Sequence, residues 1–240
     1  MEDRECRRSE QFLRRYRMLE GLLEKRYADD RASSASVVIE YLRDPDSAPY
    51  RTELDLCREI RNLLTHNADG GGEAVVEPSE AMLQVLEGII RHVQQPRMAI
   101  DFGTPQDKIL FAHPNDSAIN VMRHMLRMGF SHVPVRDRNG LVGVFSPGSL
   151  FNYVGETGFD ALSNSIRIGD LKQSLDFGEE RSEKYRFMPK DATLPAVREA
   201  FDKHPTRNSR LSVVFITEDG TRDTPILAML TPWDVLKETK

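Results

Sequence analysis

The fold of residues 98–240 is decided by a pattern that runs Gly129-Phe-Ser-His-Val-Pro-Val135, turns at Asn139-Gly140 and closes as Leu141-Val-Gly-Val-Phe-Ser146-Pro-Gly-Ser149. The pattern occurs again as Leu211-Ser-Val-Val-Phe-Ile216, Glu218-Asp-Gly220 and Ile226-Leu-Ala-Met-Leu-Thr231-Pro-Trp-Asp234. An internal repeat of this kind indicates one supersecondary unit that is used twice. Because the unit ends in a hydroxyl residue and, in the second copy, an acid, it suggests a pair of ligand-binding units and not a catalytic fold.

Each copy predicts short strands around a helix. The apolar runs of strand length in the first copy are residues 109–111, 133–135 and 141–145. Asn139-Gly140, between the last two runs, is a strong signal for a β-hairpin. Asp116 and Asp191 each follow a proline by two positions and are the expected N-caps of the helices. We therefore expect an α+β fold with two strand–helix–strand–strand–helix units.

Residues 1–96 have the apolar spacing of amphipathic helices. The first helix carries its apolar residues at Phe12, Tyr16, Leu19, Leu22 and Leu23. A second helical segment carries Val37, Val38, Tyr41 and Leu42. After a proline-rich break at residues 44–49, a third helix is expected from about residue 51 to 66. Its predicted buried stripe consists of Leu56, Ile60, Leu63 and Leu64. A further helix starts at residues 78–80, so this region predicts an antiparallel helical bundle.

Composition limits the range of partners. The net charge of −5 gives no general attraction to DNA or to anionic membranes. No apolar run approaches the roughly 18 residues that a membrane span needs. Cys6 and Cys57 lie far apart without metal-ligand spacing, which fits a reducing compartment. We expect a soluble cytoplasmic protein without a metal or redox cofactor.

The repeat resembles the cystathionine β-synthase (CBS) domain pair, on the residues quoted above and on the segment Ile168-Gly-Asp-Leu171. The resemblance implies a first CBS domain at residues 98–155 and a second at residues 166–240, each a βαββα unit. It implies that clefts between the two copies bind an adenosine-containing ligand such as AMP, ADP or ATP, and that occupancy regulates an attached domain. It also implies a homodimer.

The two closing motifs contain the expected ligand contacts. Thr231 ends a strand and Asp234 lies in the first turn of the last helix, so a hydroxyl and a carboxylate can face one cleft. The carboxylate can accept hydrogen bonds from both ribose hydroxyls. The alternative is a helix cap, with Thr231 as N-cap and Asp234 favoured by the helix dipole. In the first copy Ser146 is followed by Ser149 instead of an acid, so we expect that site to be empty, weaker or structural.

Cations near the repeat are candidate phosphate contacts. They are Arg186, Arg207 and Arg210 in the second copy and His132 in the first. Each is also compatible with an exposed, solvated charge, so these assignments are left open.

The third helix contains Arg61-Asn-Leu-Leu-Thr-His66 and resembles HEPN domains, helical bundles that often act as metal-independent RNases. The resemblance implies that His66 acts as general base or acid, that Arg61 stabilises phosphate charge and that Asn62 orients the backbone. All three residues are predicted on the face opposite the leucine stripe. The alternative is a polar helix face without catalysis.

These observations leave three hypotheses. The first is a regulatory protein whose CBS pair binds an adenosine nucleotide and modulates a dimeric helical domain. The second is a nucleotide-gated endoribonuclease that acts on RNA, and the third is a structural adaptor without ligand. The sequence favours the first, and it leaves the question of catalysis open while leaning against it.

Overall fold

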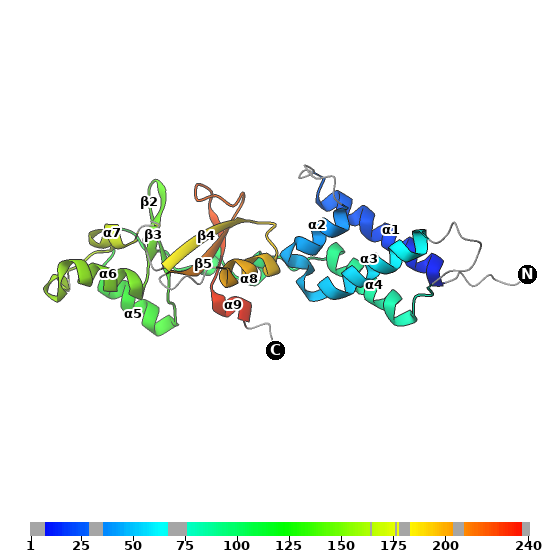
Figure 1. Cartoon of the computed structure of the whole chain (residues 1–240). Helices are drawn as coiled ribbons and strands as arrows, with labels where there is room; N and C mark the ends of the chain where they lie inside the picture. The colour runs from blue at the N-terminus through cyan, green and yellow to red at the C-terminus, as the bar shows by residue number, and fades with distance from the viewer. Residues whose placement is uncertain are drawn as a thin grey trace, which may run out of the picture. The chain divides into compact units, whose positions relative to one another are not determined.

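The structure, a computed structural model, describes residues 8–28, 36–66, 76–163, 165–175, 177, 183–203 and 209–236. The chain divides into two compact units, residues 1–97 and residues 98–240, which we call the helical unit and the mixed unit (Figure 1). Each is described by itself. The presence of both helices and β-sheets confirms the mixed fold class expected from the sequence.

The helical unit is built around one apolar core. Its described elements are α1 (Arg8–Arg26), α2 (Val37–Arg43), the 3-10 helix η1 (Pro45–Tyr50), α3 (Arg51–His66) and α4 (Glu80–Gln94). Helix α1 packs against the other three helices, most extensively against α4. The buried residues of α1 include Phe12, Tyr16, Leu19 and Leu23, as the spacing predicted. The proline-rich break is the η1 turn, because Pro45 occupies its first position and Asp44 caps it.

Helix α3 buries only part of the predicted stripe, because Ile60 and Leu64 pack against the core but Leu56 and Leu63 do not. Leu54 and Cys57 are fully buried, whereas Leu56 and Leu63 are each 45% exposed. The prediction was wrong because leucines lie on several sides of this helix, and only the contacts with α1 and α4 select the inward face. Burial also raises the pKa of the Cys57 thiol to about 12, which keeps this thiol protonated at neutral pH.

The mixed unit consists of two halves, each preceded by a short leader. The first leader (residues 98–108) contains η3 (Ala99–Asp101), β1 (Thr104–Pro105) and η4 (Gln106–Lys108). The first half (residues 109–163) contains α5 (Ala118–Met128), β2 (Val133–Asp137), β3 (Gly140–Phe145), α6 (Pro147–Thr157) and η5 (Phe159–Ala161). The second leader (residues 166–175) contains η6 (Ile168–Leu171) and α7 (Lys172–Leu175). The second half (residues 183–236) contains β4 (Glu183–Pro189), α8 (Leu194–Asp202), β5 (Arg210–Thr217), β6 (Ile226–Leu230) and α9 (Pro232–Leu236).

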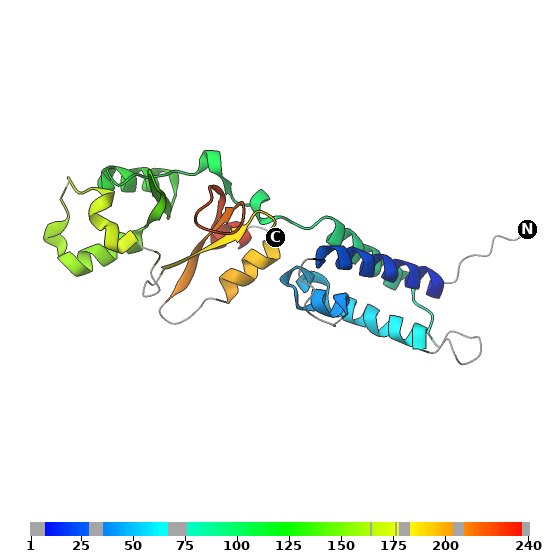
Figure 2. The same ribbon diagram turned by 90° about the horizontal axis from the view of Figure 1, so that it is seen from above.

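The strands of each half belong to a separate β-sheet. Strands β2 and β3 pair antiparallel through the predicted turn, where Gly140 has a φ of +122°. In the second half β4 lies parallel to β5, and β5 is antiparallel to β6, in the order β1-β6-β5-β4. Figure 2 shows the yellow β4 and the orange β5 of this sheet from above. Residues 109–111 do not form the predicted strand, and only Ala112 makes a single parallel bridge, to Val135. The prediction was wrong because a strand requires backbone pairing with a neighbouring strand, and an apolar run does not by itself provide that pairing.

The helices of the repeat start slightly later than predicted. Ser117 is the N-cap of α5, and its hydroxyl accepts from the backbone N–H of Asn120. Thr193 caps α8 in the same way. The predicted caps Asp116 and Asp191 were wrong, because a hydroxyl residue one or two positions later reaches the free N–H groups instead. The carboxylate of Asp116 accepts from the N–H of His113.

Each leader packs on the half that does not directly follow it. In the first leader, the N–H of Ala99 donates to the carbonyl of Ala192 at 2.9 Å, and β1 pairs antiparallel with β6. In the second leader, the N–H of Ile168 donates to the carbonyl of Asp116 at 2.9 Å. The isolated bridges Met98–Thr193 and Arg167–Ser117 both end on the N-cap residue of a half's first helix. The two halves therefore exchange their leaders by equivalent contacts.

Three apolar cores result from this exchange. One lies within the first half and includes Ile166, Ile168 and Leu171 of the second leader. A second lies within the second half and includes Ala99 of the first leader. The third is shared between the halves and consists of Ile109, Val144, Val213, Phe215 and Ile226. Neither half is a separate body, because each contributes apolar surface to the core of the other.

Candidate functional site

The closing motif of the second half holds a carboxylate at the end of β6. The N–H and the hydroxyl of Thr231 both donate to Oδ2 of Asp234, each at 2.8 Å. Both residues are partly exposed. The first leader passes directly beside this strand end, since a Cβ added to Gly103 would lie 2.9 Å from the carbonyl oxygen of Met229. The arrangement is that of a helix cap, and it also fixes the orientation of the carboxylate.

The closing motif of the first half is buried instead. Ser146 and Ser149 form a reciprocal capping box at the start of α6, with distances of 2.9 and 3.1 Å between backbone nitrogens and hydroxyl oxygens. Their exposed fractions are 1% and 3%. The two serines of this motif, which lacks an acid, thus bond each other's backbone. This agrees with a structural role, one of the three alternatives (empty, weaker or structural) expected for this site.

A carboxylate from the second half completes this buried motif. Glu183, at the start of β4, accepts a hydrogen bond of 2.5 Å from the Ser146 hydroxyl, 37 positions away. Its side chain also accepts from the hydroxyl of Tyr185 at 3.3 Å and pairs with Arg210 at 3.4 Å. Nε2 of His132 lies 3.7 Å from Oε1, at ion-pair distance. We call these five residues the Glu183 cluster.

The absence of a side chain on Gly148 lets the carboxylate approach α6. A Cβ added at this position would lie 2.8 Å from Oε2 of Glu183, closer than such contacts allow. Glycine at the second position of α6 is therefore required for the cluster to form.

The electrostatics of the cluster favour the ionised carboxylate. Burial raises the pKa of Glu183, but His132, Ser146 and Arg210 outweigh burial and bring the pKa down to about 2. Nε2 of His132 is buried and has no hydrogen-bond partner among the described residues.

Three of the predicted ligand contacts, Ser146, His132 and Arg210, converge on Glu183. Of the other two predicted cations, Arg186 is exposed on β4, and Arg207 lies outside the described residues. Sequence reasoning missed Glu183 and Tyr185. An isolated acid at a strand start gives no local signal, and two of its partners, Ser146 and His132, come from the other copy of the repeat.

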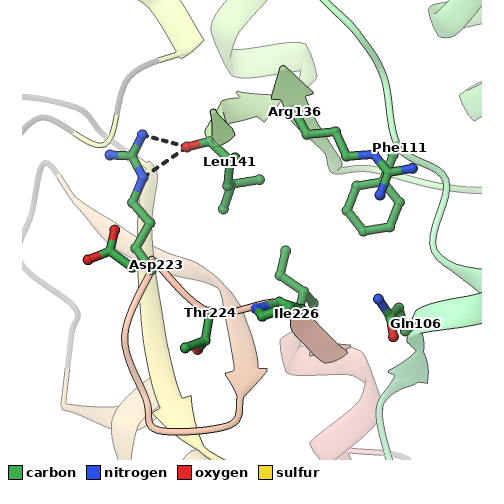
Figure 3. A pocket seen from close by; sticks show the side chains of 10 residues that line it. Gln106, Phe111, Arg136, Leu141, Asp223, Thr224 and Ile226 are labelled. Carbon is green, nitrogen blue, oxygen red and sulfur yellow. Dashed lines mark hydrogen bonds between the residues drawn. The ribbon is translucent and has the colours of Figure 1, made fainter. Parts of the chain in front are cut away.

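A cavity of about 200 Å³ lies at the opposite end of β6 from Thr231, between the two halves (Figure 3). Phe111 and Leu141 line it from the first half and Ile226 from the second. The guanidinium of Arg136 lies 4.3 Å from the centre of the Phe111 ring, which it covers in Figure 3. None of the predicted site residues lines this cavity.

Arg222, on the rim of this cavity, links the two halves. Its Nε and Nη2 both donate to the carbonyl of Leu141, at 2.9 and 2.5 Å, and its guanidinium lies 4.4 Å from the centre of the Phe177 ring. We expect Arg222→Ala to lower the free energy of unfolding by about 1–2 kcal/mol, because two charge-assisted hydrogen bonds and a ring contact are lost. Urea denaturation measures the change, with Arg138→Ala in the exposed β2–β3 turn as the control. Equal stability of the two variants would contradict the prediction.

In the helical unit Arg61, one of the predicted catalytic residues, faces differently from the expectation. Nη2 of Arg61 donates to Glu20 of α1 at 2.8 Å, and Nη1 donates to the Asn62 side chain at 3.1 Å. The guanidinium also lies 5.5 Å from the Tyr16 ring centre. Arg61 points toward α1 because it follows Cys57 by one helical turn on the buried side of α3. The structure describes the backbone of His66, the last residue of α3, and the catalytic role stays a prediction.

Two further findings concern metal ions and membranes. Within the ranges that the structure describes, no three His, Cys, Asp or Glu side chains are placed to hold a metal ion. No helix in those ranges is long and apolar enough to cross a bilayer.

Comparison with known proteins points to the mixed unit. A search of curated protein sequences found no match. Similar solved structures include CBSX2 in complex with AMP, 18% identical over 59% of this chain and 94% of that one, with a TM-score of 0.41. Protein MJ1225 from Methanocaldococcus jannaschii is 17% identical over 76% of this chain and 63% of its own length, with a TM-score of 0.43. The acetoin utilization protein AcuB from Vibrio cholerae is 14% identical over 60% and 90%, with a TM-score of 0.43. Residues 100–156, which contain most of the first half (residues 109–163), match the family model of the CBS domain.

Proposed function

We propose that residues 98–240 form a regulatory module, a pair of CBS domains that binds an adenosine-containing nucleotide. The match over residues 100–156 supports the first domain. The equivalent elements of the second half, together with the exchange of leaders, support a second domain of the same kind.

The observation that carries the ligand proposal is the fixed carboxylate of Asp234. Two donors of Thr231 hold its Oδ2, so its orientation does not have to be ordered when a ligand binds. A carboxylate held in this way suits the two hydroxyls of a ribose. The first leader, at the start of the mixed unit in sequence, lies beside Leu230 and would form one side of the ligand site.

Regulation requires that the ligand favours one arrangement of the protein over another. The two halves share a core and exchange leaders, so a ligand that changes their packing changes the mixed unit as a whole. We propose that this change is passed to the helical unit, which then acts as the output of the module.

Thermal unfolding with a panel of AMP, ADP, ATP, cyclic dinucleotides and S-adenosylmethionine tests the proposal. A ligand at about 100 times its dissociation constant stabilises the folded state by about 2.7 kcal/mol. We expect Asp234→Ala to abolish the shift and Asp234→Asn, which keeps an acceptor for Thr231, to reduce it. Asp191→Ala, an exposed acid in the same half, is the control and should leave the shift unchanged. The absence of any shift, or an undiminished shift in Asp234→Ala, would contradict the proposal.

A further inference from the structure

The Glu183 cluster gathers the donors that commonly bind phosphoryl oxygens. A guanidinium from Arg210, an imidazole from His132 and hydroxyls from Ser146 and Tyr185 surround one carboxylate. These groups come from both halves of the mixed unit and meet beside the first turn of α6, an 11-residue helix. Charged and hydroxyl donors that converge on one anionic group form a typical anion site.

These donors need an anion at this place. Ser146 as a whole is 1% exposed, and the side chain of His132 is 11% exposed. Buried donors without a partner destabilise a folded protein. The guanidinium of Arg210, whose side chain is 76% exposed, lies at the edge of the cluster. The carboxylate of Glu183, itself 11% exposed, supplies both the acceptor and the charge.

The two closing motifs obtain their carboxylates in different ways. In the second half, Asp234 belongs to the motif and is held by Thr231. In the first half, Ser149 stands at the corresponding position, and the carboxylate beside Ser146 comes from the other half. The carboxylate therefore occupies space that a ligand of the first motif would need.

We propose that the Glu183 cluster is a latent phosphoryl-binding site whose resident anion is the Glu183 carboxylate. A phosphoryl group binds to Ser146, His132 and Arg210 only when that carboxylate is displaced or neutralised. The ligand is a phosphate monoester, and its identity as a nucleotide rests on the proposed function. The wild-type chain consequently binds one nucleotide, at Thr231 and Asp234, and the first half stays closed.

Glu183→Gln is the sharpest test, because glutamine has nearly the same size and keeps an acceptor for Ser146 and Tyr185. The variant removes the negative charge that pairs with the guanidinium of Arg210 and lies 3.7 Å from Nε2 of His132. We expect its affinity for inorganic phosphate to rise by about tenfold or more over wild type, since a like charge no longer opposes the ligand. Titration calorimetry measures the affinity. Adding Arg210→Gln to this variant should remove the gain.

Glu218→Gln is the matched control, because Glu218 is an exposed acid of the same half that pairs with Lys190. The inference is overturned if Glu183→Gln binds phosphate no more tightly than Glu218→Gln. Should Glu183→Gln not fold in chloride, it is refolded in phosphate: recovery supports the inference, and failure in both salts overturns it.

Nucleotide stoichiometry separates this inference from the proposed function. With AMP, we expect one site in wild type and two in Glu183→Gln. A gain in phosphate affinity without any AMP binding to wild type would support the latent site and count against the proposed function. One AMP site in both proteins, with no gain in phosphate affinity in Glu183→Gln, would support the proposed function and count against the latent site.

Discussion

Asp46→Ala is expected to lower the free energy of unfolding of the helical unit by about 3–5 kcal/mol, the range found when one partner of a buried ion pair is removed. The Asp46 side chain is fully buried, and its Oδ2 accepts from Nη1 of Arg26 at 2.7 Å. Nε2 of His92 lies 2.9 Å from its carbonyl oxygen and 3.3 Å from Oδ1. Arg26 keeps Asp44 at 3.1 Å as its second partner, but the variant leaves the positive charge undercompensated.

The measurement is urea denaturation of the full chain, with hydrogen exchange of α1 and α4 amides to locate the effect. Glu87→Ala serves as the control, since Glu87 is an exposed acid that pairs with Arg15 at 3.6 Å. Such surface pairs contribute about 1 kcal/mol or less. A loss in Asp46→Ala no larger than that in Glu87→Ala would show that the buried pair does not hold the unit together.

The same cluster predicts a pH window for stability. Burial raises the pKa of Asp46, but hydrogen bonds from His92 and Arg26 outweigh burial and leave the pKa below its ordinary value of 3.8. The hydrogen bond to Asp46 raises the pKa of His92 above 6.5, against the effect of burial. The Asp46 contribution is present above pH 3.8 and is lost as the pH falls through its lowered pKa. The His92 contribution is present below pH 6.5 and is lost as the pH rises through its raised pKa. In the Asp46→Ala variant, the decline on the alkaline side should disappear.

Phe215→Ala is expected to lower the free energy of unfolding of the mixed unit by about 3–5 kcal/mol, the usual cost of removing a buried aromatic ring. Phe215 is fully buried in β5, pairs in register with Phe187 and stacks on that ring with 5.3 Å between centres. It belongs to the core that Val144 of the first half shares with Ile226 of the second. The cavity left by the ring would lie between the halves, so both should lose stability together.

Hydrogen exchange of amides in β3 and β6 reports on the two halves separately. The control is Phe151→Ala on α6, where the ring is 78% exposed and its removal should change stability by less than about 0.5 kcal/mol. Loss of protection in β6 alone would mean that the halves unfold independently, contrary to the expectation from their shared core.

The sequence predicted those features that depend on neighbours along the chain. The spacing of Phe12, Tyr16, Leu19 and Leu23 identified the buried face of α1. Asn139-Gly140 located the turn between β2 and β3, because this dipeptide suits a tight hairpin. The repeat identified the two closing motifs, and residues 100–156, which include the first of them, match the family model of the CBS domain.

Features that depend on distant partners could not be predicted in this way. The predicted burial of Leu56 and Leu63 on α3 was wrong, because periodicity does not rank leucines on different sides of a helix. The burial of Leu54 and Cys57 instead turns Arg61 toward Glu20. The segment at residues 109–111 is apolar, yet it makes no strand because only Ala112 finds a ladder partner.

The sequence by itself determined the repeat, most of the secondary structure and the difference between Asp234 and Ser149, since these are properties of residue type and local spacing. Only the tertiary structure decided that the leaders are exchanged and that Glu183 supplies the carboxylate beside Ser146. The physical reason is that an ion pair or a shared core is stabilised by groups close in space, and for Ser146 and Glu183 these lie 37 positions apart along the chain.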